Sequence, residues 1–162
     1  MWAAIAGVAQ IIASAFAPGF FPDWYFLFVA LGYAFLLPAL AILHVRQAAV
    51  RGSGAVLATT AGAAAIVIGL AASASADLVI AALLLRGIWW WTVGKMWVET
   101  GVMPRWLGQG TMAFAVAAIT AAVLTAPLGT GTGIFWTLER IVVGGWALAV
   151  SYALWRTRAV VL

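Results

Sequence analysis

The chain has 162 residues, with no cysteine and only one histidine. Without cysteine, disulfide bonds, thiolate catalysis and cysteine-ligated zinc or iron–sulfur centres are excluded. With His44 alone, a bis-histidine haem site within one chain is excluded as well. The sequence contains neither G-x-S-x-G nor H-E-x-x-H, and the loop with Gly129, Gly131 and Gly133 lacks the lysine and serine of a phosphate-binding loop. We therefore expect no metal, no cofactor and no catalytic constellation.

Charge is scarce too, since the chain has 8 Lys and Arg side chains and 4 Asp and Glu side chains. Charged residues make up 7% of the sequence and hydrophobic residues 67%, whereas soluble domains have about 25% charged and about 45–50% apolar residues. A water-soluble fold has too little interior for so much apolar surface. The composition predicts an integral membrane protein in contact with the lipid bilayer, and its few basic residues argue against nucleic acid as a partner.

Six apolar runs fill most of the chain, at residues 1–17, 24–45, 54–72, 77–100, 106–126 and 134–155. A helix that crosses a bilayer needs about 20 such residues. We predict an all-α integral membrane helical bundle of about six transmembrane helices, forming a single domain over residues 1–162. The Ala-Phe-Ala at 15–17 also fits a signal-peptidase site, so a cleaved first run followed by five helices remains an alternative.

Basic residues collect in alternate gaps between the runs. Arg46 and Arg51 share one gap, Arg105 lies in another, and Arg156 and Arg158 follow the last run. Lys and Arg accumulate in cytoplasmic loops of membrane proteins, and the net charge of +4 suits loops that face an anionic inner leaflet. The pattern predicts a multi-pass protein of the inner (plasma) membrane with both termini in the cytoplasm.

Arg86, Glu139 and Arg140 are charged residues that lie deep inside the predicted spans, away from their inner ends. Each such charge costs about 2.5–3.5 kcal/mol on insertion scales and is a functional candidate. Counted from the outer ends of their helices, Arg86 and Glu139 differ in depth by about 5 Å at 1.5 Å per residue. We predict an interhelical ion pair between them, with Arg140 either sharing the pair or reaching the outer interface. The pair either fastens two helices together or forms part of a ligand or ion site.

Ten tryptophans make the chain tryptophan-rich. At 100° per residue, Arg86, Trp90 and Trp97 share one helix face, so Trp90 is a candidate for a cation–π contact or for the wall of a ligand pocket; apolar packing is the alternative. The consecutive residues Trp89–Trp91 point in three directions, which predicts that at least one of them faces lipid or a partner.

The inner end of the same run offers a secondary polar pair. Lys95 and Glu99 are four residues apart, so they can pair along one helix face. His44, at the inner end of another run, is expected to be a solvated interfacial histidine. The small residues of run 54–72, such as Gly62 and Gly69, allow close helix contacts and predict a central place for that helix.

Two stretches carry a family resemblance. Tyr33–Arg46, which contains LPALAILHVR, and Val102–Gly108, VMPRWLG, resemble segments of small polytopic membrane proteins of actinobacterial type whose domain has no known function. The resemblance implies a bacterial protein with a helical membrane bundle, and it supplies no site residues.

Three functional classes remain open. Short loops and polar groups on both faces of run 77–100 favour a non-enzymatic accessory or scaffold subunit, whose partners are other membrane subunits or a second copy of the chain. A small transporter or channel, with Arg86, Glu139 and Arg140 along its path, is the alternative. A membrane enzyme acting on a lipophilic substrate is a second alternative, with few candidates for a general base.

Overall fold

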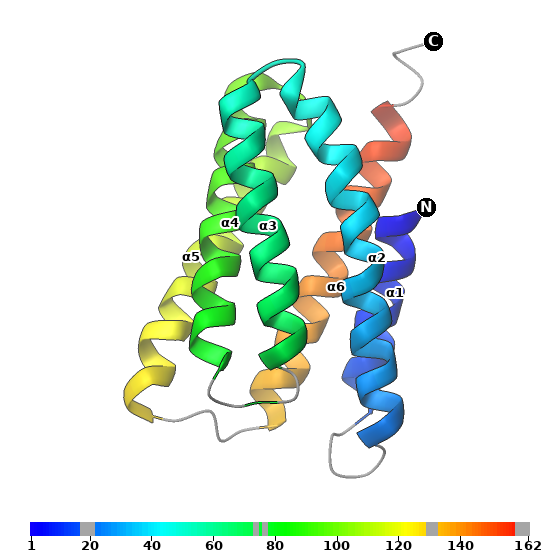
Figure 1. The fold of residues 1–162 in the computed structure, drawn as a ribbon, viewed down its shortest axis with the longest axis vertical. Coiled ribbons are helices and arrows are strands. Elements are labelled where there is room, and N and C mark those ends of the chain that lie inside the picture. Colours follow the sequence, from blue (N-terminus) through cyan, green and yellow to red (C-terminus); the bar gives the residue numbers. More distant parts are fainter. Residues whose placement is uncertain (17–21, 73–74, 76–77, 129–132, 158–162) are drawn as a thin grey trace.

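The computed structural model describes residues 1–16, 22–72, 75, 78–128 and 133–157, with the backbone alone at 22, 125–128 and 133–136. Six helices run alternately up and down the molecule (Figure 1). Their bounds are α1 Trp2–Ala15, α2 Pro22–Ala48, α3 Gly52–Ala72, α4 Val79–Thr100, α5 Arg105–Leu128 and α6 Gly133–Arg156. The predicted all-α bundle is confirmed. Ala17, Asp77 and Arg158, which entered the predictions above, lie outside the described residues.

Four helices, α2 to α5, are long and apolar enough to cross a membrane. Helix α1 has 14 residues and so extends about 21 Å at 1.5 Å per residue, less than the hydrocarbon thickness of about 30 Å. Helix α6 has 24 residues but carries Glu139, Arg140 and Arg156. Length and apolar composition therefore identify a membrane protein and four of the six predicted spans.

The turn between α4 and α5 has the tight geometry that its sequence suggests. Gly101 takes φ 70°, a left-handed conformation that glycine adopts without steric cost, and ends α4. Its N–H donates to the carbonyl oxygen of Trp97 at 3.0 Å. Pro104 immediately precedes α5, where a missing N–H costs nothing. This short connection holds α4 and α5 side by side along their length.

Neighbouring helices pack in the order α6, α1, α2, α3, α4, α5, whereas the backbones of α5 and α6 approach each other at few points. Two of these interfaces are close enough for backbone contact. A Cβ atom on Gly144 would lie 2.8 Å from the Gly7 carbonyl oxygen, and one on Gly94 would lie 2.7 Å from that of Gly108. The helix backbones therefore form an incomplete ring, and on its open side the buried Trp146 of α6 donates a hydrogen bond from Nε1 to Thr111 Oγ1 of α5 at 3.0 Å.

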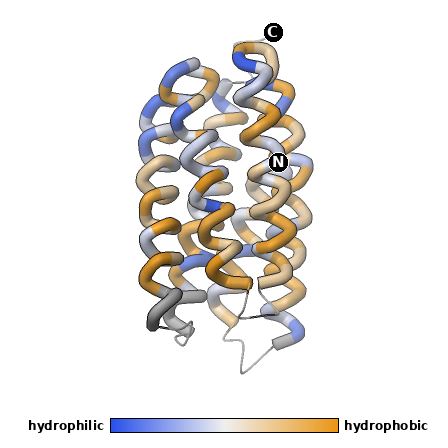
Figure 2. The backbone as a smooth tube through the Cα atoms, turned by 60° about the vertical axis from the view of Figure 1, so that its left-hand side comes forward, coloured by the Kyte–Doolittle hydropathy of each residue, from blue (hydrophilic) through white to orange (hydrophobic). Residues whose placement is uncertain are grey.

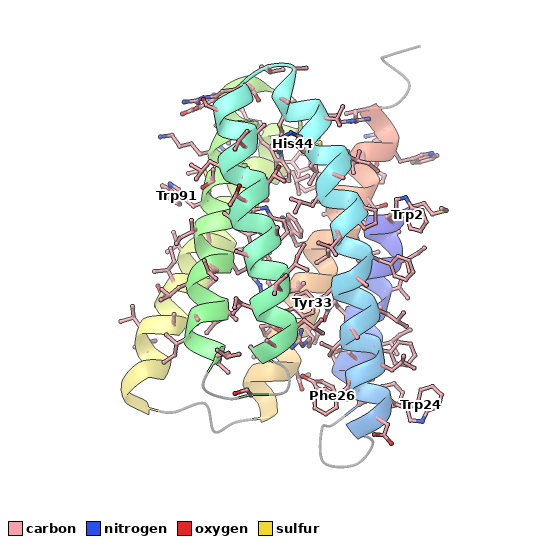
Figure 3. The ribbon with its side chains drawn as sticks, in the orientation of Figure 1. Trp2, Trp24, Phe26, Tyr33, His44 and Trp91 are labelled. Carbon is pink, nitrogen blue, oxygen red and sulfur yellow. The ribbon has the colours of Figure 1, made fainter. Side chains whose placement is uncertain are left out.

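Aromatic side chains fill much of the interior. Trp89, Trp90 and Trp97 of α4 surround Trp146 of α6, with ring centroids 5.2, 5.6 and 6.5 Å from its own. All four are buried. Trp91, in contrast, is 43% exposed and points away from the bundle (Figure 3). The predicted divergence of the three consecutive tryptophans is confirmed, and so is the buried face shared by Arg86, Trp90 and Trp97.

The predicted central place of the third helix is wrong. Its most apolar stretch is 39% buried, against 56% for α4. The small residues do allow close contact, since a Cβ on Gly62 would lie 2.7 Å from the Trp89 ring. However, Val56, Leu57 and Val67 on another face of α3 are exposed. Small residues thus specify how closely α3 approaches its neighbours and leave its position in the bundle open.

The two ends of the bundle differ in polarity. Hydrophilic residues gather at the upper end, near the α2–α3 and α4–α5 turns (Figure 2), while Trp24 lies at the lower end (Figure 3). Met1 lines one cavity with Arg46 and Trp155, and the Arg46 Nη1 donates to Thr157 Oγ1 at 2.6 Å. Both ends of the described chain therefore lie toward the basic end of the bundle, as predicted.

Candidate functional site

Five polar side chains meet inside the apolar bundle, and we call them the central cluster: Gln10 of α1, Tyr33 of α2, Arg86 of α4, and Glu139 and Arg140 of α6. Arg86 and Arg140 are only 4% and 1% exposed. At 1.5 Å per residue, Arg86 lies about 10 Å from the start of α4, and Glu139 about 9 Å from the start of α6. Because both helices start at the lower end, the two side chains reach the same depth (Figure 1).

Glu139 is shared by two arginines. Its Oε1 pairs with Arg86 Nη1, so the structure brings together the two residues predicted to pair. Its Oε2 lies 3.3 Å from Arg140 Nε. Arg140 therefore shares the pair and does not extend to the outer interface, because its side chain turns inward between α1 and α2.

Tyr33 and Gln10 complete the cluster. Arg86 Nη2 donates to the Tyr33 hydroxyl oxygen at 2.6 Å, and Arg140 Nη1 donates to the same oxygen at 3.1 Å. Arg140 Nη1 also donates to Gln10 Oε1 at 3.2 Å. Tyr33 points from α2 into the bundle (Figure 3). Sequence reasoning missed both residues. Gln10 could have been recognised, because it is the one amide side chain in the apolar sequence of α1.

Glycines make room for these side chains. A Cβ on Gly32 would lie 2.5 Å from the Gln10 amide nitrogen, and one on Gly69 would lie 2.6 Å from the Tyr33 hydroxyl oxygen. Small residues let membrane helices approach each other closely. At these two positions they also let polar side chains lie between helices, so the cluster is held in one arrangement by its surroundings.

The central cluster buries charges of both signs. Its described residues supply two guanidinium groups and one carboxylate. Burying charge away from water is costly unless each group is matched by an opposite charge and by hydrogen bonds. Tyr33 and Gln10 are neutral, and both accept hydrogen bonds from the arginines.

A cavity of about 210 Å³ adjoins the cluster, and we call it the lateral cavity. Its lining includes Arg86 and Trp90 of α4, Phe114 and Ala117 of α5, and Glu139 of α6. It therefore lies between α4, α5 and α6, on the open side of the ring of helix backbones. The Arg86 guanidinium carbon is 5.8 Å from the centroid of Trp90, which gives the predicted cation–π contact.

Lys95 and Glu99 belong to a separate group at the upper end. Lys95 Nζ lies 3.8 Å from Glu99 Oε1, as the spacing predicts. The closer partner of Glu99 is Arg51, whose Nη1 lies 2.5 Å from Oε2. That contact joins the α2–α3 turn to α4 and was not predicted, because nothing in the sequence sets these helices side by side. All three side chains are exposed, by 41–58%.

Glu99→Gln is accordingly expected to lower the free energy of unfolding in detergent by less than about 1 kcal/mol. Exposed ion pairs are weakened by water and by counterions, so the effect should shrink further when salt is raised to about 1 M. Unfolding at low and high salt measures both quantities. A larger, salt-independent loss would contradict the assignment of this group to the solvated surface.

His44 was expected to be a solvated interfacial histidine, but it is only partly exposed to solvent. Its Nδ1 lies 2.8 Å from Thr59 Oγ1, in a partly buried contact between α2 and α3. The side chain of Thr59 replaces water as its hydrogen-bond partner, and the two helices enclose the pair. Within the described part of the chain, no three His, Asp or Glu side chains come together as metal ligands would.

Comparisons of this chain with protein-family models, with curated proteins and with solved structures found no match. The likeness of Tyr33–Arg46 and Val102–Gly108 to actinobacterial membrane proteins therefore stays a prediction. What the site does has to be argued from the charges, contacts and cavity described above.

Proposed function

We propose that this chain is a multi-pass protein of the plasma membrane, with its basic loops and termini in the cytoplasm, that binds a small ligand at the central cluster. This is the transporter-like hypothesis of the sequence analysis. The observation that carries it is a buried arginine, Arg86, on the wall of the lateral cavity, paired with a glutamate that a second buried arginine also contacts. Intramembrane charges of this kind mark ligand and ion paths in membrane proteins.

A purely structural role fits the cluster less well. Two helices can be fastened together by one arginine and one carboxylate, whereas here a second buried arginine, Arg140, contacts the same carboxylate. The hydrogen bonds that the two arginines donate to Tyr33 and Gln10 hold both guanidinium groups in place. Such preorganised positive charge favours a bound anion or a polar group with a partial negative charge.

Native mass spectrometry of protein extracted from its own membrane tests this proposal. We expect a small molecule bound in a one-to-one ratio, and we expect the Arg86→Gln, Glu139→Gln double variant to lose it while retaining a cooperative melting transition. An unchanged bound molecule in the double variant would contradict the proposal. If the double variant does not fold, Ala117→Leu, which narrows the lateral cavity from its exposed α5 wall, takes its place with the same expected loss.

One observation favours the scaffold hypothesis as a second candidate. Helix α1 starts below the upper ends of α2 and α6 (Figure 1), and a cavity lined by Met1, Trp2, Arg46 and Trp155 lies at that step. A helix of another membrane subunit would fill this step. The same extraction distinguishes the two functions, because a scaffold brings down a stoichiometric partner protein and leaves the central cluster without a small molecule.

A further inference from the structure

We propose that the exposed face of α4 carries a binding groove for an anionic phospholipid. The phosphate group would lie between Arg51 and Lys95, and an acyl chain would run past Trp91 toward the middle of the membrane. We call this site the outer groove. The central cluster uses the buried face of the same helix, so the inference goes beyond the proposed function and does not depend on the ligand proposed there.

Two adjoining cavities form the outer groove. The upper cavity, of about 260 Å³, is lined by α3, α4 and Arg51, which immediately precedes α3. The lower cavity, of about 410 Å³, lies between α4 and α5. Trp91 and Thr92 line both cavities. The two spaces therefore follow each other along the outside of α4.

The groove changes from charged to apolar along its length. Lys95 and Glu99 line the upper cavity, while Ile88 lines the lower one together with Ile119 of α5. These α4 side chains and Trp91 are exposed and recur every three or four residues, which places them on one face of the helix. A ligand that matches this face has a charged head and an apolar body.

Depth along α4 places the charged end of the groove among the lipid head groups. Lys95 lies five residues before Thr100, the last residue of α4, so its Cα is about 8 Å from the end of the helix at 1.5 Å per residue. The head-group region is about 5–8 Å thick on each side of the hydrocarbon, and a lysine side chain extends its ammonium group toward that region. Trp91 lies one turn deeper and points away from the bundle (Figure 3), so it meets the upper part of the acyl chains.

Two cations share one carboxylate at this end. Arg51 Nη1 lies 2.5 Å from Glu99 Oε2, whereas Lys95 Nζ lies 3.8 Å from Glu99 Oε1, which is beyond hydrogen-bond distance. In the part of the chain that the structure describes, the Lys95 ammonium group has no nearer acidic partner. Because Arg51 and Lys95 are exposed, their remaining N–H donors are accessible to a phosphate oxygen. The proposed orientation puts this end in the cytoplasmic leaflet, whose anionic lipids attract Lys and Arg.

The size of the groove favours a lipid over a helix of another chain. One turn of an α-helix is about 10–12 Å wide and about 5.4 Å long, a volume on the order of 500 Å³. That is more than either cavity holds, and a helix that crosses the membrane has several turns. An acyl chain is much thinner, and the phosphate next to it matches the charged end of the groove.

The test measures lipid binding to the delipidated full-length protein in a neutral detergent by native mass spectrometry. The probes are dioleoyl phosphatidylglycerol, which has one negative charge, and dioleoyl phosphatidylcholine, which has the same chains and no net charge. We expect phosphatidylglycerol to bind at least about fivefold more tightly, because Arg51 and Lys95 repel the choline cation. Soluble glycerol phosphate at the same concentration should not compete, since it lacks the chains that contact the lower cavity.

Lys95→Gln removes one cation from the groove, so it should weaken phosphatidylglycerol binding by about fivefold and leave phosphatidylcholine binding nearly unchanged. Its matched control is Arg105→Gln. Arg105 is an exposed cation at the same end of the bundle, at the start of α5, but it lines neither cavity. That variant has the same change in net charge and should bind both lipids as the original chain does.

Glu99→Gln should have the opposite effect. It removes the negative charge beside the phosphate and releases Arg51 from its ion pair, so phosphatidylglycerol should bind about threefold more tightly. If these residues served only to fasten α3 to α4, Lys95→Gln and Glu99→Gln would change binding in the same direction or not at all. All three variants replace exposed side chains, and a cooperative melting transition checks that each is folded.

Equal affinity for the two lipids would overturn the inference, as would weaker binding by Glu99→Gln. Equal losses in Lys95→Gln and Arg105→Gln would reveal a general attraction to the basic end, and competition by glycerol phosphate would reveal a site for soluble phosphates. Either result also overturns it. The Arg86→Gln, Glu139→Gln double variant should keep the preference for phosphatidylglycerol, so the proposed function and this inference can fail separately.

Discussion

Glu139→Gln should lower the free energy of unfolding by about 3–5 kcal/mol, the range found when one partner of a buried ion pair is removed. The substitution leaves Arg86 and Arg140 buried and facing each other without an acid between them. Glutamine keeps the size of the side chain, so the loss comes from charge and not from a cavity. Unfolding by titration from mild detergent into SDS, followed by tryptophan fluorescence, measures it.

The matched comparison is Arg86→Gln. That variant leaves Glu139 paired with Arg140, so the buried carboxylate keeps an arginine partner, and we expect a smaller loss of about 1–3 kcal/mol from the broken hydrogen bond to Tyr33 and the changed packing. The order of the two variants is therefore diagnostic. Equal losses, or a larger loss for Arg86→Gln, would show that the buried arginines are stabilised mainly by something other than Glu139.

Gly144→Ala should force α1 and α6 apart. The new Cβ atom would lie 2.7 Å from a side-chain carbon of Ile11 and 2.8 Å from the Gly7 carbonyl oxygen, which is backbone and cannot rotate away. Overpacking of this kind costs about 1–3 kcal/mol. The effect should extend to the central cluster, because Gln10 of α1 and Arg140 of α6 hydrogen-bond across the same interface.

The neighbouring glycine supplies the control. A Cβ atom on Gly145 meets nothing within 4 Å, and alanine favours a helix over glycine by about 1 kcal/mol in general. Gly145→Ala should therefore be neutral or slightly stabilising in the same SDS titration. If both variants lose stability equally, helix propensity or lipid contact governs this segment, and the close approach of α1 and α6 contributes little.

The sequence was sufficient to predict the helices, the Arg86–Glu139 contact and the buried face of α4. Each of these depends on a periodic pattern or on depth along a helix, and both quantities can be counted from residue numbers. Hydrophobic runs set the helix positions, and the high cost of intramembrane charge restricts Arg86 to a partner at its own depth.

The remaining parts of the site depend on which helices are neighbours. Gln10 joined the cluster because α1 packs against α6, and Tyr33 joined it because Arg86 and Arg140 both reach its hydroxyl group inside the bundle. The exposed contact between Arg51 and Glu99 exists because α3 packs against α4. Helix order around a membrane bundle is set by packing among similar apolar surfaces, so a single sequence gives little information on it. The wrong prediction for α3 has the same origin, since small residues favour close contact without naming the partner.

The place of Glu139 on the last helix has a consequence for biosynthesis. Ribosomes make α4 well before α6, so Arg86 reaches the translocon while the acid that will pair with it has not yet been translated. Until α6 has been made, we expect the earlier helices to pack differently, with Arg86 facing water or lipid phosphates. Docking of α6 against α1 would then bring Glu139 to Arg86 in one late step.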